Sequence, residues 1–221
     1  MKAIKNILSI CSVALLLGSC QADLLETKPY GNVAAGNMWT SENFADKGVT
    51  AIYSTLRKSY VGLGLYQMDC LGVSTDCRDA DYPIMRNTIT TSNGMFSSYW
   101  SEHYSGISRA NDAIVHLPEV DMPENKKARY MAEAKVLRAY FYYKLNIMYK
   151  GVPVYLEPVE ASECTKGQET EAAVWQVIED DLTAAINEPN LPNIYTEGSS
   201  DYGRVTKGLA YALRGKAYLY Q

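Results

Sequence analysis

The chain has 221 residues, of which 47% are hydrophobic and 21% are charged. It can therefore bury a hydrophobic core, and its length fits one domain or part of a larger protein. Its 21 basic and 25 acidic side chains give a formal charge of −4. No run of Lys or Arg offers a face for phosphates, which argues against a nucleic-acid partner.

The beginning of the chain has the pattern of a bacterial lipoprotein signal peptide. Two lysines precede an apolar run over residues 7–17, and Gly18, Ser19 and Cys20 follow it. The run is too short for a membrane-spanning helix, which needs roughly 20 apolar residues. Small residues before a cysteine resemble the lipobox cut by the lipoprotein signal peptidase. The sequence thus predicts a signal peptide over residues 1–19 and a mature chain anchored by an acylated Cys20.

A tether and a first helix are expected next. Residues 20–38 have no helical period and contain backbone-breaking Pro and Gly, so they are interpreted as the lipidated tether. Ser41 is expected to cap the helix, and Gly62 and Gly64 are expected to end it. Its apolar positions recur at near-helical spacing and are Phe44, Ile52, Leu56 and Tyr60.

Residues 62–98 are polar and rich in Gly, Asp, Ser and Thr, which predicts a long irregular loop. Such loops are often functional, and this one combines aromatic faces with groups that pair sugar hydroxyls. The candidate ligand contacts are Tyr66, Asp76, Arg78, Asp79, Asp81, Tyr82 and Asn87. A solvated loop without a ligand stays the alternative for each of them. Cys70 and Cys77 in the same loop either form a disulfide or stay as thiols.

Four segments with a clear helical periodicity follow the loop. The first runs from Trp100 to about Leu117, and the second opens after Asp121 and Pro123 and stops at Gly151. Thr170 is expected to cap the third helix, which carries Trp175, Ile178, Leu182 and Ile186 on one face. Thr206 is expected to start the fourth, which carries Ala210, Leu213, Ala217 and Tyr220.

An internal repeat relates the second and fourth of these helices. The fragments over residues 134–139 and 210–215 share Ala, Leu, Arg and a small residue in register, 76 residues apart (210 − 134). Tyr142 and Tyr218 follow at the same distance. Each helix before a copy carries a tryptophan. The sequence therefore predicts a mainly α fold of tetratricopeptide-like helical hairpins with long irregular loops, in which the residues expected to pack are Trp100, Trp175, Tyr130, Tyr140, Tyr142, Tyr143 and Tyr149.

The sequence carries no signature of catalysis. His103 and His116 have no Cys or carboxylate near them at metal-ligand spacing, so neither a metal nor a cofactor is predicted. The acids between Asp69 and Asp81 have no spacing that selects general acid and base over simple hydrogen bonding. Asp180 and Asp181 are interpreted as a solvated helix face. No catalytic residue is therefore assigned.

Eight fragments along nearly the whole chain share their order with a known family. They comprise Cys20 with residues 23–29, Trp39, residues 51–56, Trp100 with residues 104–111, and residues 132–139, 149–154, 174–182 and 203–210. Together they resemble the N-terminal domain of the SusD/RagB family of outer-membrane nutrient-binding lipoproteins.

The resemblance implies a lipoprotein on the outer membrane that binds an oligosaccharide or another nutrient without cleaving it. It also implies that a SusC-type TonB-dependent transporter is the partner, that the helices face this transporter, and that loops form the ligand surface. Family members continue well beyond this length, so residues 39–221 are expected to be an N-terminal helical domain truncated at its C-terminal end. A helical scaffold without a small ligand, or a non-functional fragment of a longer protein, are the alternatives.

Overall fold

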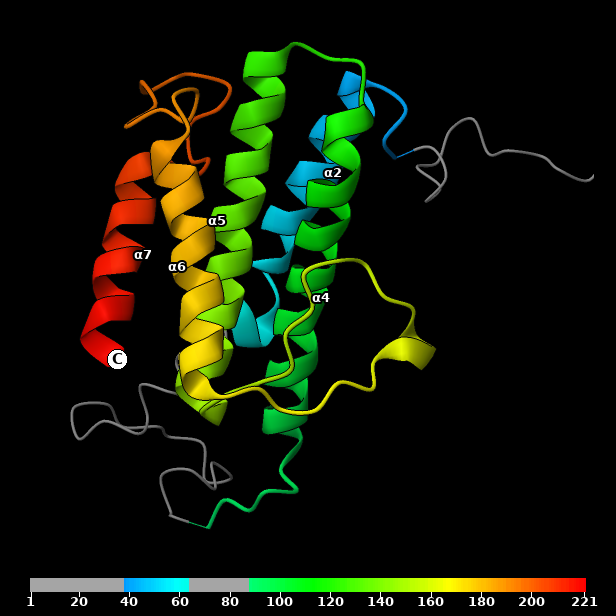
Figure 1. Cartoon of the computed structure of the whole chain (residues 1–221), viewed down its shortest axis with the longest axis vertical. Coiled ribbons are helices and arrows are strands. Elements are labelled where there is room, and N and C mark those ends of the chain that lie inside the picture. The colour runs from blue at the N-terminus through cyan, green and yellow to red at the C-terminus, as the bar shows by residue number, and fades with distance from the viewer. Residues whose placement is uncertain (1–37, 64–87) are drawn as a thin grey trace, which may run out of the picture. The chain divides into compact units, whose positions relative to one another are not determined.

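The computed structural model of the chain describes residues 38–63 and 88–221, and every regular element in these ranges is helical (Figure 1). The main helices are α2 (Glu42–Thr55), α4 (Gly94–His116), α5 (Glu124–Tyr149), α6 (Glu171–Asn187) and α7 (Lys207–Tyr220). A π-helical turn (Ser59–Leu63) and two 3-10 turns (Leu117–Glu119 and Ala161–Glu163) join them. The prediction of a mainly α fold is confirmed. Within the described residues, no helix has both the length and the apolar character needed to cross a membrane.

Local capping explains where several of the helices begin. The Thr170 hydroxyl accepts a hydrogen bond from the Ala173 amide at 3.2 Å, and the Thr206 hydroxyl accepts one from the Leu209 amide at 3.3 Å. Both caps were predicted, and such a cap stabilises a helix by about 1 kcal/mol. Ser41 also occupies an N-cap position, but its side chain makes no capping bond.

Two predicted helix boundaries are wrong. α2 ends at Thr55 and not at Gly62, because the following residues turn toward α4, where the Tyr60 amide donates to Glu102 at 2.7 Å. α4 begins at Gly94, within the segment predicted to be a loop. The Asn93 side chain accepts a hydrogen bond from the Met95 amide at 2.9 Å and so caps the helix before Trp100.

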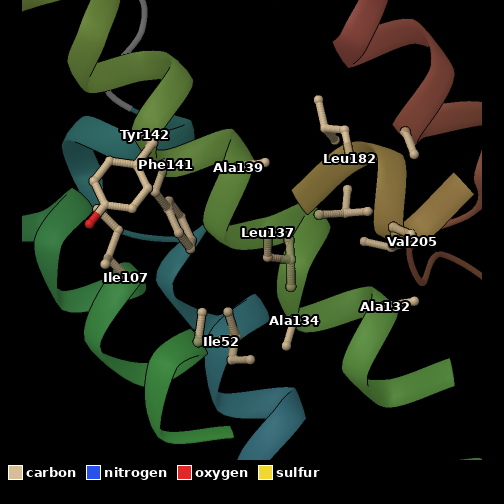
Figure 2. Close-up of a cluster of buried hydrophobic side chains, with 14 of the residues drawn as sticks. Ile52, Ile107, Ala132, Ala134, Leu137, Ala139, Phe141, Tyr142, Leu182 and Val205 are labelled. Carbon is tan, nitrogen blue, oxygen red and sulfur yellow. The ribbon is translucent and has the colours of Figure 1, made fainter. Parts of the chain in front are cut away.

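The helices form two hairpins, α4–α5 and α6–α7, and α5 lies at the centre because it packs against both α4 and α6. Figure 1 shows α2 and α4 on one side of α5, and α6 and α7 on the other. The core between them is built from aliphatic and aromatic side chains, among them Ile107, Leu137, Phe141 and Leu182 (Figure 2). A Cβ atom on Gly106 would lie 2.5 Å from the Phe141 ring, so α4 and α5 can approach this closely only at a glycine.

The residues that define the internal repeat pack as predicted in α5, but only in part in α7, where Gly215 and Tyr218 are exposed. Ala134 and Ala139 on α5, and Ala210 and Ala217 on α7, are completely buried. Trp175 is also buried, with its ring centre 5.9 Å from that of Tyr143. Of the five tyrosines on α5, Tyr130, Tyr142 and Tyr143 are buried, and Tyr140 and Tyr149 pack at the edge of the core.

A buried charge network fixes the loop before α7 to α2 and α5. The fully buried Glu133 carboxylate accepts hydrogen bonds from the Tyr53 hydroxyl at 2.7 Å and from Arg204 at 2.9 Å. Arg204 also pairs with Asp46 at 2.7 Å. Burial raises the pKa of Glu133, although the nearby Arg204 guanidinium acts in the opposite direction. The network holds three separate parts of the chain in one arrangement.

Candidate functional site

The predicted site residues fall outside the part of the chain that the structure describes. This holds for the seven candidate ligand contacts, Tyr66, Asp76, Arg78, Asp79, Asp81, Tyr82 and Asn87, and for Cys20, Cys70 and Cys77. Their roles stay predictions. The described residues form a different candidate site, beside the segment that follows α5.

A glycine turn at the end of α5 directs this segment. Lys150 has the left-handed conformation (φ 56°), and Gly151 follows with φ 101°. A Cβ atom at Gly151 would lie 2.3 Å from the Glu169 carbonyl oxygen, so only glycine fits. The buried Asn146 side chain accepts a hydrogen bond from the Gly151 amide at 3.0 Å. The chain thereby turns back across α4 and α5 (Figure 1).

We call residues 152–157 the strap, and side chains of α4 and α5 satisfy its backbone polar groups. The Tyr142 hydroxyl donates to the Tyr155 carbonyl and accepts from the Tyr155 amide, both at 2.8 Å. The Tyr104 hydroxyl donates to the Pro153 carbonyl at 2.6 Å. Burial raises the pKa of both phenols, Tyr104 and Tyr142, so both remain donors at neutral pH. An extended segment outside any sheet is fixed in place by these bonds.

Arg138 links the strap to α6. Its guanidinium donates to both carboxylate oxygens of Asp181 at 2.8 Å, to the Asn111 side chain at 2.9 Å and to the Leu156 carbonyl at 3.1 Å. Asn111 in turn donates to the Tyr155 carbonyl at 2.9 Å. Arg138, Asn111 and Asp181 are all buried, so each of these bonds lies in a region of low dielectric constant.

The interpretation of Asp181 as a solvated residue is wrong. Its side chain is 7% exposed and faces α5, whereas the neighbouring Asp180 is exposed. Successive residues of a helix point about 100° apart, so two adjacent acids do not share one environment. The partner that decides the matter, Arg138, lies 43 residues earlier in the chain.

A pocket of about 490 Å³ lies between α4 and the segment containing the strap. This volume falls within the range of about 300–1,000 Å³ that is typical of small-molecule sites. Its lining residues are Trp100, Ser101, Tyr104, Ile107, Ser108, Asn111, Pro153, Tyr155, Glu157, Val159, Cys164 and Lys166. They combine aromatic rings with hydroxyl, amide, carboxylate and ammonium groups.

The aromatic side of the pocket is held by ring packing. Trp100 lies with its ring centre 4.9 Å from that of Tyr104 and 5.0 Å from that of Tyr149, at 84° to the latter. Tyr104 also meets Tyr155 edge to face at 6.3 Å. Trp100 therefore packs as predicted, but it also lines the pocket because it is only partly buried.

The polar rim of the pocket suits a neutral, hydroxyl-rich ligand. Lys166 donates to the Val154 carbonyl at 3.0 Å and lies 5.2 Å from the Tyr155 ring centre. Glu157 is exposed and is the single carboxylate among the lining residues. Residues 38–63 and 88–221 contain no group of three His, Cys, Asp or Glu that could hold a metal ion. Aromatic faces beside exposed hydroxyl and charged groups suit the two sides of a sugar ring.

Comparison with known proteins places the chain in a family. A SusD-like family model, described as starch-binding and associating with the outer membrane, matches residues 23–219. The chain belongs to the SusD-like family. This confirms the resemblance inferred from the sequence. The SusD-like proteins P38 and P25 of Formosa agariphila are 28% and 23% identical to it, over 100% and 98% of this chain and 43% of each relative.

Solved structures of SusD-like proteins share the fold. A laminarin binding SusD-like protein is 36% identical and superposes with a TM-score of 0.71, over 83% of this chain and 41% of that one. Surface glycan-binding protein A from Bacteroides uniformis is 28% identical, with a TM-score of 0.72, over 82% of this chain and 42% of that one. The SusD-like chain thus spans less than half the length of these proteins.

The strap and its anchors in this SusD-like chain were not predicted from the sequence. The available signals were polar residues at positions where a helical period requires apolar ones. Asn111 lies on the apolar face of its helix, and Arg138 lies within a run of small and apolar residues. A polar side chain at such a position indicates a buried hydrogen-bond network, since burial without partners is costly.

Proposed function

We propose that this SusD-like chain binds an oligosaccharide at the outer membrane and that the pocket between α4 and the strap contacts it. The observation that carries the proposal is the aromatic side formed by Trp100, Tyr104 and Tyr155 beside a polar rim of hydroxyl and charged groups. The family description and the similarity to a laminarin-binding and a glycan-binding protein support it.

The physical basis is a preformed site. The apolar face of a sugar ring packs on the exposed part of Trp100, while Ser101, Ser108 and Glu157 lie where they can pair its hydroxyl groups. The strap is already held by the hydrogen bonds from Tyr104, Tyr142 and Asn111. Little conformational entropy is then lost when the ligand binds, which favours affinity.

We propose binding without cleavage. Glycosidases generally place two carboxyl groups on either side of the scissile bond, about 5–9.5 Å apart. The pocket lining supplies Glu157 alone. A sugar held here would meet aromatic faces and hydrogen-bonding groups, but not an acid and a base in opposed positions.

Substitution of Trp100 tests the proposal. Trp100→Ala should weaken binding of laminarin or another bound oligosaccharide by about tenfold or more, because it removes the largest ring in the pocket. Isothermal titration calorimetry against a panel of oligosaccharides measures the change. Tyr202→Ala is the matched control, since Tyr202 is exposed and does not line the pocket. Equal affinities of the two variants, or an absence of binding to every glycan in the panel, would contradict the proposal.

We also propose that an acylated Cys20 anchors the mature chain and that a SusC-type TonB-dependent transporter receives the ligand. Both follow from the signal-peptide pattern and from the family resemblance. Cys20→Ala should abolish incorporation of radiolabelled palmitate and release the chain from the outer-membrane fraction. Retention of the label by the variant would rule out Cys20 as the acceptor.

A further inference from the structure

The outer face of α7 is apolar and uncovered. Tyr218 is 53% exposed and Leu219 is 86% exposed, and Tyr211 is exposed beside them. Gly215 lies on the same side, and a Cβ atom there would meet nothing within 4 Å. A helix face with a small residue between large apolar ones allows a second helix to pack closely against it.

The internal repeat shows what such a face does elsewhere in this chain. The residues of α5 that lie 76 positions before Arg214, Gly215, Tyr218 and Leu219 are Arg138, Ala139, Tyr142 and Tyr143. All four are buried in α5, and Arg138 is only 6% exposed. In α7 the corresponding residues are exposed or half-buried. The two helices therefore offer the same pattern, but only the face of α5 is covered.

α6 covers one side of this face of α5 through two contacts, whereas Tyr104 of α4 and the strap cover Tyr142. Asp181 of α6 pairs with Arg138, and Trp175 of α6 packs against Tyr143. The corresponding positions on α7 are Arg214 and Leu219. Arg214 makes no ion pair within the described ranges, and its nearest polar contact is the Thr183 hydroxyl at 3.4 Å. Its guanidinium therefore remains available to a carboxylate.

The charges of the helices alternate. α6 carries four acidic side chains and no Lys or Arg, whereas α7 carries three basic side chains and no acid. A second copy of the chain packed through its own α7 would bring like charges together, which is unfavourable. An acidic helix packed on α7 would instead place opposite charges next to each other, as the acidic α6 does beside the basic α7.

We propose that the face of α7 formed by Tyr211, Arg214, Gly215, Tyr218 and Leu219 docks an acidic amphipathic helix, in the way that α5 docks α6. The occupant places a carboxylate on Arg214 and a large apolar side chain on Leu219. This interaction surface is independent of the proposed glycan site, since none of its residues lines that pocket.

A peptide with the sequence of α6 is the probe. Residues 168–189 are synthesised with a hydrocarbon staple between positions 172 and 176, both exposed in the protein, so that the peptide is helical in water. The full chain is titrated into the fluorescently labelled peptide, and anisotropy reports binding. Saturable binding is expected. It should weaken about tenfold or more when Arg214→Gln is introduced or when the peptide carries Asp181→Asn.

Matched controls keep the charge changes equal. Lys216→Gln removes one positive charge from α7 outside the proposed face, and a peptide with Asp180→Asn removes one acid from its solvent side. Both should bind within about twofold of the parent, because exposed charges contribute little. Circular dichroism verifies that each α7 variant keeps the parent helix content. No peptide binding, equal weakening by Lys216→Gln and Arg214→Gln, or self-association of the chain through α7 in place of peptide binding would overturn the proposal.

Discussion

Asp181→Ala is expected to lower the free energy of unfolding by about 3–5 kcal/mol, because it leaves the buried Arg138 guanidinium without its carboxylate. The pair is bidentate, with both N–O distances at 2.8 Å, and neither side chain can reach bulk water without local unfolding. Urea denaturation at pH 7, followed by circular dichroism, measures the loss.

Asp180→Ala is the matched control for this substitution. Asp180 is the adjacent acid on the same helix, but it is exposed, so its removal should change stability by no more than about 0.5 kcal/mol. A double variant, Arg138→Met with Asp181→Leu, should recover only part of the loss. The Asn111 side chain and the Leu156 carbonyl would then lose the donor that Arg138 provides. Equal stabilities of the Asp180 and Asp181 variants would contradict the assigned role of the pair.

The sequence was sufficient to predict the parts of the fold that depend on local interactions. Thr170 and Thr206 cap their helices as predicted, because a cap needs only a side chain and an amide two or three residues later. The end of α5 was also predicted, since Gly151 is required by a left-handed turn. The N-cap of α4, Asn93, was the same kind of local signal, but the polar stretch around it favoured a loop.

The candidate site depended on contacts between distant residues, which one sequence does not reveal. The pocket brings Trp100 and Tyr104 of α4 against Tyr155 and Lys166, which lie about 50 to 65 residues later in the sequence. The burial of Asp181 depends on Arg138, and the position of the strap depends on Asn111 and Tyr142. Helical periodicity shows which face of a helix is apolar. It does not show which helix covers that face.

The second large effect on stability is expected from protonation of His103, which is fully buried in the core. Its ring stacks on Tyr99 with ring centres 4.1 Å apart, and Nδ1 donates to the Tyr99 carbonyl at 2.7 Å. Nε2 has no hydrogen-bond partner among the described residues, so it is the unprotonated nitrogen of a neutral ring. Protonation of Nε2 would bury the positive charge of an imidazolium ring and an N–H group without a hydrogen-bond acceptor. Burial accordingly lowers the pKa of His103 from 6.5 to about 4.

This lowered pKa makes the protein less stable in acid. In the unfolded chain the histidine takes up a proton near pH 6.5, whereas in the folded chain it does so near pH 4. Its contribution to stability is therefore complete above pH 6.5 and is lost as the pH falls toward 4, by about 2.5 kcal/mol between pH 7 and pH 4.5. His103→Leu should remove this part of the acid-induced loss. The variant should consequently approach or exceed the parent in stability at pH 4.5, even if it is less stable at pH 7.

Urea denaturation at a series of pH values between 4.5 and 7 measures this effect as a difference between the parent and the variant, so that titration of the carboxylates cancels. His116→Leu is the matched control, because His116 is partly exposed and lies beside Asp112 at the surface. The His116 variant should keep the pH dependence that His103→Leu loses. If parent and His103→Leu lost stability in parallel as the pH fell, the buried ring would not be the group that takes up the proton on unfolding.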